Sequence, residues 1–267
     1  MAKKKGKRNM PQWARRLLWL GLVLAVTLVA WMNKKYLRRA YRYVAHRYYK
    51  THFSPTDFPQ AYAVHGIDIS HYQDVLDWNK LIAVNTEGDT IQFRFVFIKA
   101  TQGLWLEDDL FDEYWEEARD HNMVRGAYHY FLPDRNPRIQ AKNFISSVKL
   151  EKGDLPPVVD IEETRGKTAA EIDTALRQFL TIVEQHYGVK PIIYSNINFI
   201  EDYLQDQFAD YPFWIAHYYR DELTADENIN WVFWQHSDKA DLLGINGKTD
   251  ANVFNGGEEA FRKLLIP

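Results

Sequence analysis

From Tyr62 onward, short apolar stretches typical of β-strands alternate with longer stretches that have helical periodicity. This alternation favours a parallel sheet whose strands are connected by crossover helices. The expected strands cover residues 64–70, 93–100, 126–131, 158–162, 191–195, 213–218, 231–237 and 249–253. The expected helices cover residues 77–84, 109–121, 137–148, 168–186, 198–203 and 258–265.

Most of the expected strands end in polar residues, and the last three have little helical sequence between them. We therefore expect an α/β fold, an irregular TIM-like β/α barrel of about eight strands with its site at the C-terminal ends of the strands. A doubly wound open sheet is the alternative.

Charge is distributed very unevenly along the 267 residues. Residues 1–50 carry 14 of the 33 Lys and Arg side chains and none of the 36 Asp and Glu side chains. The rest of the chain is therefore strongly acidic, which argues against nucleic acid as a partner because phosphate binding needs a basic surface. The chain has no cysteine, so disulfides and thiolate metal sites are excluded.

The basic N-terminus surrounds an apolar run, residues 17–32, that has no charged side chain. We interpret this run as an uncleaved transmembrane signal anchor, with a cleaved signal peptide as the alternative. Residues 1–16 would be a basic tail, residues 33–61 a basic juxtamembrane segment and linker, and residues 62–267 the folded domain. This division predicts a cell-envelope protein whose folded domain lies outside the cytoplasm, or a secreted one if the anchor is cleaved.

The fourth expected strand runs from an apolar start into carboxylates, with the sequence P-P-V-V-D-I-E-E. Because successive side chains of a strand alternate between faces, Asp160 and Glu162 share one face, with Cα atoms roughly 6.5 Å apart. Two carboxylates this close disfavour each other's ionisation, so one can hold a proton near neutral pH. That arrangement suits general-acid cleavage of a glycosidic bond.

A barrel would bring further acids to the same mouth. Asp68 ends the first expected strand, and Asp250 belongs to the last, which is its neighbour in a closed barrel. We expect these two to meet Asp160 and Glu162 in one pocket. Side chains on other strands would form its walls: Tyr128, Tyr130, Tyr194, Trp214, Tyr218, Trp234 and Gln235.

Eight segments in order carry a family resemblance: G-I-D-I-S-H-Y-Q, F-I-K-A-T-Q-G, G-A-Y-H-Y-F, V-V-D-I-E, I-I-Y-S, F-W-I-A-H-Y, W-Q-H-S and D-A-N-V-F. Together they resemble glycoside hydrolase family 25, the lysozymes of the fungal Chalaropsis type with bacterial and phage relatives. The resemblance runs from Gly66 to about Phe254. It implies an irregular barrel and N-acetylmuramidase activity on the β-1,4 bond between N-acetylmuramic acid and N-acetylglucosamine in peptidoglycan.

Matched motif by motif, the resemblance implies that Glu162 is the general acid and Asp160 its partner carboxylate. It also assigns Asp68 and Asp250 to the catalytic set. Either a carboxylate or the 2-acetamido group of the substrate would attack the anomeric carbon, and the D-x-E spacing favours the acetamido group. We expect peptidoglycan glycan strands as the partner, a monomeric catalytic domain, and neither cofactor nor metal.

Three other functions compete with this interpretation. A wall-binding module would need the aromatic walls but not the full set of acids. A chitinase-like glycosidase typically carries a longer D-x-x-D-x-D-x-E run, and Val158 stands in the place of the acid two residues before Asp160. A metal-dependent deacetylase would need a histidine ligand set, yet no H-x-x-x-H pair occurs. The histidines considered for it are His65, His71, His129, His217 and His236.

Overall fold

The computed structural model of the protein describes residue 19 and residues 58–73, 76–84, 90–204, 207–218, 222–223 and 225–267. The chain divides into two units, Met1–Thr51 and His52–Pro267, and the elements described below belong to the second. The expected tail, anchor and juxtamembrane segment (residues 1–61) lie outside the described residues, apart from Trp19 and residues 58–61. Among the described residues, no helix is long and apolar enough to cross a membrane.

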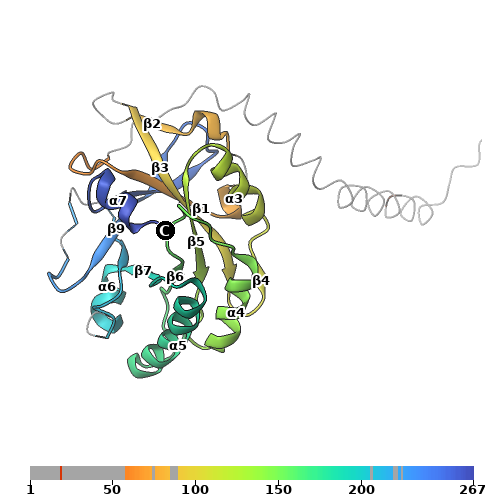
Figure 1. The fold of residues 1–267 in the computed structure, drawn as a ribbon, viewed down its shortest axis with the longest axis vertical. Coiled ribbons are helices and arrows are strands. Elements are labelled where there is room, and N and C mark those ends of the chain that lie inside the picture. The colour runs from red at the N-terminus through yellow and green to blue at the C-terminus, as the bar shows by residue number, and fades with distance from the viewer. Residues whose placement is uncertain are drawn as a thin grey trace, which may run out of the picture. The chain divides into compact units, whose positions relative to one another are not determined.

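Eight strands in the described part of the chain close into a barrel (Figure 1). The order around the barrel is β1, β3, β5, β6, β7, β8, β9 and β10, and β10 pairs with β1 to close it. Their bounds are His65–Ile69, Thr90–Gln102, Val124–Tyr130, Val158–Asp160, Ile192–Asn196, Phe213–Ala216, Trp231–Asp241 and Lys248–Phe254. The barrel is the expected architecture, and the open sheet is excluded by the β1–β3 and β1–β10 pairings.

One strand runs against the expected direction. β10 is antiparallel to both of its neighbours, β9 and β1, whereas the other neighbouring pairs of the barrel are parallel. The expectation of an all-parallel sheet is therefore wrong at β10. The reason is that only residues 242–247 connect β9 to β10, which is too short for a crossover and forms a hairpin instead.

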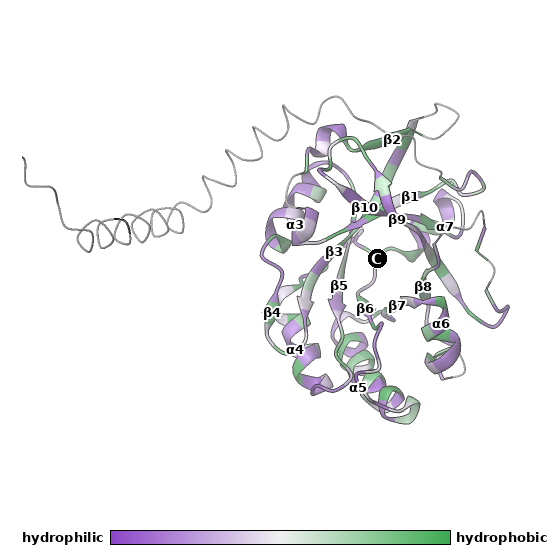
Figure 2. Cartoon of the chain, turned by 180° about the vertical axis from the view of Figure 1, so that it is seen from behind, coloured by the Kyte–Doolittle hydropathy of each residue, from purple (hydrophilic) through white to green (hydrophobic). Residues whose placement is uncertain are grey.

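Helices cover the outside of the first part of the barrel. They are α3 (Phe111–Asp120), α4 (Pro137–Ser147) and α5 (Ala169–Tyr187), followed by α6 (Ile197–Phe199), the π-helical turn η3 (Ile200–Leu204) and α7 (Glu258–Leu264). Figure 2 shows hydrophilic and hydrophobic residues mixed on α4 and α5, as expected for helices with one face on a sheet. No α-helix joins β8 to β9 or β9 to β10 in the described residues, which agrees with the expected irregularity.

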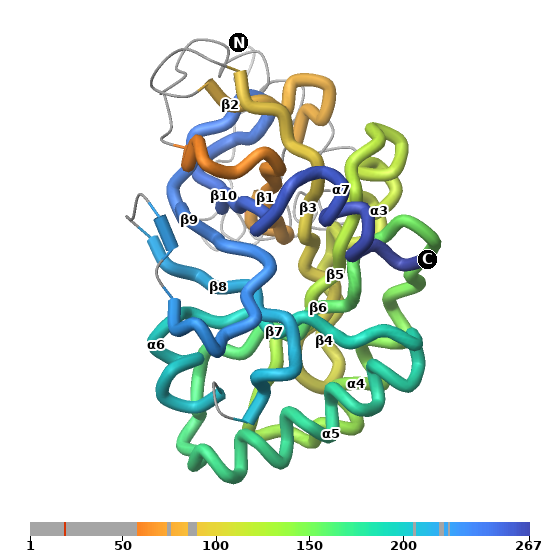
Figure 3. The backbone as a smooth tube through the Cα atoms, turned by 60° about the vertical axis from the view of Figure 1, so that its left-hand side comes forward, coloured from red at the N-terminus to blue at the C-terminus, as the bar shows by residue number. Residues whose placement is uncertain are grey.

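Short elements decorate the barrel. The 3-10 turns η1 (His71–Gln73) and η2 (Trp78–Lys80) follow β1, and two small strands, β2 (Ile82–Val84) and β4 (Leu106–Glu107), pair with opposite ends of the long β3 (Figure 3). The helix expected over residues 77–84 is therefore wrong. Its second half forms β2 because Ile82 and Val84 pair with the start of β3, and tertiary pairing overrides local preference.

The barrel interior is filled in layers. Phe261 of α7 packs against Phe95, Phe233 and Phe254 and so fills the end opposite the strand C-termini. Above it, Phe97 stacks on Trp214 with ring centroids 4.3 Å apart. A further layer contains the carboxylates described below. In the described part of the chain, these apolar layers close one end of the barrel, so a ligand would enter at the C-terminal ends of the parallel strands.

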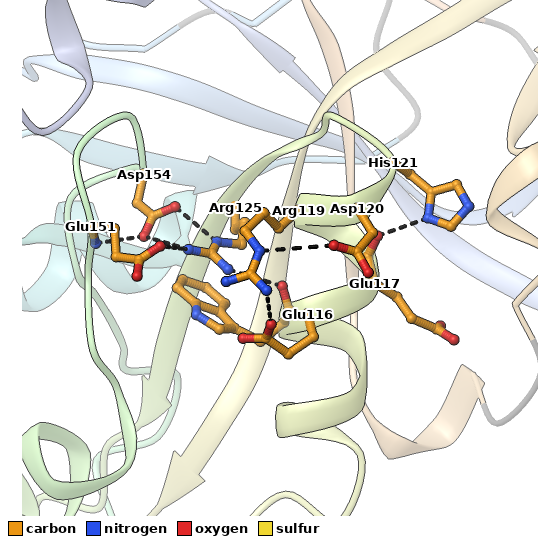
Figure 4. A network of polar contacts seen from close by, with 9 residues as sticks. Glu116, Glu117, Arg119, Asp120, His121, Arg125, Glu151 and Asp154 are labelled. Atoms are coloured by element: carbon orange, nitrogen blue, oxygen red, sulfur yellow. Dashed lines mark hydrogen bonds and ion pairs between the residues drawn. The ribbon is translucent and has the colours of Figure 1, made fainter.

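A buried cation, Arg125, holds the start of β5 in place. Arg125 donates hydrogen bonds to Asp154 (2.9 Å) and Glu151 (2.9 Å), and its guanidinium lies 4.3 Å from the Trp115 ring of α3 (Figure 4). The side chain of Arg125 is 4% exposed, so the contacts compensate its desolvation. The neighbouring Arg119 pairs with Glu116 at the surface.

Candidate active site

A pocket of about 240 Å³ opens at the C-terminal ends of the parallel strands. All four expected acids line it: Asp68 from β1, Asp160 and Glu162 from the end of β6, and Asp250 from β10. Five of the seven expected wall residues also line it: Tyr128, Tyr130, Tyr194, Trp214 and Gln235.

The reversed direction of β10 explains how Asp250 reaches the pocket. Asp250 lies near the start of β10, and the antiparallel register pairs it with Asp68 at the end of β1. A parallel β10 would place its C-terminal residues at the mouth instead. The two acids do meet, as expected, but through a different strand orientation from the one expected.

An amide bridges these two carboxylates. Gln235 Nε2 donates to Oδ2 of Asp68 (2.8 Å) and to Oδ2 of Asp250 (3.3 Å). Its Oε1 accepts hydrogen bonds from the hydroxyls of Tyr194 (2.8 Å) and Tyr218 (2.7 Å). Two hydroxyl donors on the oxygen fix the orientation of the amide, so the nitrogen must face the acids.

A second amide holds Asp68 from β10. Asn252 Nδ2 donates to Asp68 Oδ2 at 2.7 Å, while its Oδ1 accepts from Trp214 Nε1 at 2.8 Å. Because the indole N–H can only donate, it fixes the orientation of Asn252 in the same way. Asn252 was not among the expected site residues, although it lies in the D-A-N-V-F segment. Two-residue alternation from Asp250 would have placed it on the same face.

The bridged acids differ in protonation. Burial, followed by the charge of Asp68 and a hydrogen bond with it, raises the pKa of Asp250 to about 9. Burial also raises the pKa of Asp68, but hydrogen bonds from Asn252, Gln235 and Asp250 lower it. Within the pair, the hydrogen bond between the two carboxyls favours the proton on Asp250 over Asp68.

The acids at the end of β6 include a buried carboxylate oxygen that has no hydrogen-bond partner in the described part of the chain. Asp160 is 6% exposed, and its Oδ1 is buried without a hydrogen-bond partner among the described residues. Burial raises the pKa of Asp160 well above its usual range, and the charge of Glu162 adds to the rise. Burial likewise raises the pKa of Glu162. The Tyr194 hydroxyl and the charge of Lys99 limit the rise at Glu162, whereas the pKa of Asp160 lies well above its usual range, so the resting proton favours Asp160.

One cation faces the acids. Lys99 of β3 is the only Lys or Arg among the described residues that lines the pocket, and it is 8% exposed. Its Nζ donates to Gln102 Oε1 at 2.7 Å and lies 5.4 Å from the Tyr130 ring. Burial lowers the pKa of Lys99, while Asp160, Asp108 and Glu162 raise it. Its charge in turn lowers the pKa of both β6 acids.

The sequence profile of glycosyl hydrolases family 25 matches residues 67–245, from β1 to the connection between β9 and β10. The chain belongs to glycoside hydrolase family 25. Asp250 and Asn252 lie just beyond the matched residues, yet the barrel closure brings Asp250 to the pocket and Asn252 into a hydrogen bond with Asp68.

Relatives of this family-25 chain fall into two groups. An uncharacterized protein, YegX of Escherichia coli (strain K12), is 42% identical over 207 residues, covering 78% of this chain and 75% of YegX. Lysozyme M1 of Streptomyces globisporus is 30% identical, covering 72% of this chain and 68% of that protein. The chain is thus similar both to named lysozymes of the family and to proteins without an assigned role.

Solved structures share the barrel. A family 25 glycosyl hydrolase from Bacillus anthracis is 29% identical with a TM-score of 0.69, covering 80% of this chain and 98% of that one. A bacterial lysozyme from Streptomyces coelicolor is 28% identical with a TM-score of 0.67, covering 76% and 96%. The fold of residues 58–267 is therefore the irregular family-25 barrel.

Two expected wall residues lie elsewhere in this family-25 barrel. Tyr218 does not line the pocket, but its hydroxyl donates to Gln235 beside it. Trp234 was expected in the wall, and this is wrong: it is fully buried in the outer core and donates its indole N–H to the His217 carbonyl (2.8 Å). Gln235 faces the pocket, so strand alternation turns Trp234 to the opposite face.

The histidines considered for a metal site are dispersed. Among the described residues, no group of three or more His, Asp or Glu side chains is arranged so that it could hold a metal ion. His129 is buried, with its Nδ1 2.7 Å from Thr101 Oγ1 and its Nε2 3.3 Å from Gln140 Oε1. His71 Nδ1 lies 2.6 Å from the buried Asp108. His65 and His236 flank Phe58 in edge-on ring contacts.

Proposed function

We propose that the protein is a peptidoglycan-cleaving N-acetylmuramidase with Glu162 as general acid. The observation that carries the proposal is that four carboxylates of a family-25 barrel line one pocket and differ in how readily they hold a proton. Such differences separate the acid from the charge-stabilising role in glycosidases. The relatives named lysozyme, autolytic lysozyme and N,O-diacetylmuramidase point to the same substrate class.

The proposed mechanism begins with a transfer of the resting proton. The acetamido N–H of a bound sugar would donate to the unpartnered Oδ1 of Asp160, which lowers the pKa of that carboxyl because the bond favours its charged form. Glu162 would then hold the proton and deliver it to the leaving glycosidic oxygen. After departure, Glu162 would act as base toward water.

Attack on the anomeric carbon then comes from the substrate. Asp160 lies beside Glu162 on the same strand end, a position suited to orienting the acetamido group for an assisted attack. Direct attack by a carboxylate is the competing route. A thiazoline analogue of the oxazoline intermediate should bind tightly and compete with substrate on the assisted route, and failure to bind would favour the direct one.

Asp68 and Asp250 would support the reaction rather than exchange protons with the substrate. The ionised Asp68 lies under the site and is fixed by two amides, so its charge can stabilise positive charge developing on the sugar ring. Lys99 counterbalances the acids and keeps the pocket from protonating fully.

We also propose the envelope location, in which residues 17–32 anchor the chain, residues 1–16 and 33–61 flank that anchor, and residues 62–267 act outside the cytoplasm as a monomer. The proposal rests on the apolar run and its basic flanks. Protease accessibility of the catalytic domain in intact spheroplasts would test it, and full protection of that domain would contradict it.

The chemical proposal is tested by identifying the cleaved bond. The full chain is incubated with purified peptidoglycan and separately with chitin, and the reducing ends of released fragments are reduced with borohydride and identified by mass spectrometry. A muramidase releases fragments ending in N-acetylmuramic acid and leaves chitin largely intact. Fragments ending in N-acetylglucosamine would contradict it, and binding without cleavage would favour the wall-binding module.

A further inference from the structure

Two exposed aromatic side chains stand beside the pocket, and the chemistry proposed above does not use them. Tyr72 is 79% exposed and Trp105 is 76% exposed. Both follow the C-terminal ends of barrel strands: Tyr72 lies in η1 after β1, and Trp105 lies in the turn between β3 and β4. A single exposed aromatic is ordinary on a protein surface, but two that follow strand ends at the mouth of a pocket can extend a binding groove.

The turn that carries Trp105 is held rigidly. Gly103 donates its N–H to the Tyr130 carbonyl (3.0 Å) and adopts a φ of 56°, a conformation that glycine tolerates. Asn143 of α4 donates to the carbonyls of Gly103 and Leu106, each at 3.3 Å. The Trp105 indole is thus presented to solvent from a fixed backbone, and its ring contacts no other aromatic ring of the described residues.

Tyr72 is held by its neighbour. The rings of His71 and Tyr72 lie 4.1 Å apart, and Asp108, which is buried, accepts hydrogen bonds from both the backbone N–H and Nδ1 of His71. Asp108 follows Trp105 by three residues, a reach of at most about 11 Å. The two aromatic segments are therefore joined through the His71–Asp108 contact and lie within a few sugar rings of each other.

We propose that Tyr72 and Trp105 form an aromatic rim that binds sugar rings of the glycan strand beyond the pair flanking the cleaved bond. The inference rests on the proposed function and extends it from the cleaved linkage to the length of strand recognised. Tyr72 lines the pocket itself, so the rim continues the site. The flat faces of Tyr and Trp suit the C–H faces of pyranose rings, and their polar edges tolerate the surrounding water.

The rigidity of the rim favours a glycan over a membrane or a flexible partner. Rings fixed before binding lose little conformational entropy when a ligand stacks on them. A membrane-inserting surface would need a wider apolar area than two rings on separate segments. The rim therefore predicts that the protein cleaves long strands more efficiently than short ones.

The test compares Trp105→Ala with the wild-type full chain on two substrates, a tetrasaccharide of the peptidoglycan repeat and glycan strands longer than about twenty sugars. We expect the ratio of kcat/KM on long strands to kcat/KM on the tetrasaccharide to fall about fivefold or more, through a higher KM. Leu243→Ala is the control, because Leu243 is an exposed apolar residue beside β2, at the other end of β3 from Trp105. It should leave the ratio unchanged.

A binding assay keeps the rim separate from the proposed chemistry. Co-sedimentation of each full-length protein with insoluble peptidoglycan measures the bound fraction whether or not cleavage occurs. If the wild type cleaves peptidoglycan, the comparison is made between Glu162→Gln and the same variant that also carries Trp105→Ala. Weaker binding by Trp105→Ala supports the rim even if the wild type proves inactive. An unchanged bound fraction together with an unchanged ratio, or no binding by the wild type, would overturn the rim, and the first of these would leave the muramidase proposal intact.

Discussion

Asp68 and Asp250 show how a carboxylate pair is arranged residue by residue. The meeting of Asp160 and Glu162 in one pocket, and the neighbourhood of the first and last strands, could be predicted from the sequence, although β6 ends at Asp160 and Glu162 follows it. The amides that bridge and orient the acids could not, because Gln235 and Asn252 acquire their roles from contacts between strands far apart in the chain. Trp234 was wrongly placed in the pocket wall because periodicity alone does not show which residues of β9 face the pocket and which face the outer core.

The protonated state of Asp250 leads to a prediction for Asp250→Asn. An Asn side chain keeps a donor toward Asp68 and an acceptor toward Gln235, so the free energy of unfolding near pH 5 should change little. The folded-state pKa of Asp250 is raised to about 9. Its contribution to stability is therefore fully present below the unfolded-state pKa near 4 and is lost as the pH rises toward 9.

Urea unfolding at several pH values checks this. The wild type should lose stability relative to Asp250→Asn as the pH rises from 5 to 8, by up to about 1.4 kcal/mol per pH unit. Asp68→Asn is measured beside it in an assay of peptidoglycan cleavage. It should lower kcat/KM strongly, because it removes the ionised member of the pair. Identical pH dependence in wild type and Asp250→Asn would show that Asp250 is ionised.

At the scale of elements, local signals predicted most of what the structure contains. The helix expected over residues 168–186 forms as α5, and a capping box between Thr168 and Glu171 sets its start. Two errors have a common cause. β2 and the reversed β10 both depend on pairing with a distant strand, which hydrophobic periodicity within the segment does not encode.

The buried ion pairs of Arg125 give a prediction at this scale. Arg125→Met removes a cation that pairs with Asp154 and stacks on Trp115 of α3, leaving a buried carboxylate without its partner. We expect a loss of about 3–5 kcal/mol in the free energy of unfolding. Arg119→Met removes an exposed ion pair in the same region and should cost about 0–1 kcal/mol. Similar losses in urea unfolding for the two variants would contradict the structural role of Arg125.

At the scale of the whole molecule, aromatic rings fill most of the barrel interior, and the layer that contains the carboxylates therefore lies at one end of the barrel. The aromatic content of 15% therefore serves the core and the pocket together. The number of strands and the scarcity of helices in the last third could be predicted from the sequence. The layering could not, because it depends on which residues of different strands lie at one height.

Gly66 tests whether this close packing holds the barrel together. A Cβ added at Gly66 would lie 2.4 Å from a ring carbon of Phe95, so Gly66→Ala must displace a fully buried ring. We expect a loss of about 1–3 kcal/mol in the free energy of unfolding. Gly257→Ala, where nothing lies within 4 Å of the added atom, should cost less than about 1 kcal/mol. Equal losses in thermal unfolding would mean that the interior can relax around an added methyl group.

The assignment of Glu162 as general acid is tested most directly by the rate of peptidoglycan cleavage. The variants Glu162→Gln and Glu163→Gln are compared in the full chain. The two residues are adjacent, but Glu162 lines the pocket whereas Glu163 accepts a hydrogen bond from the Tyr130 hydroxyl (2.7 Å). We predict a loss of about 10²–10⁴-fold in kcat for Glu162→Gln and a change of less than about tenfold for Glu163→Gln. A Glu162→Gln variant that cleaves peptidoglycan at the wild-type rate would contradict the assignment of the general acid and the mechanism built on it.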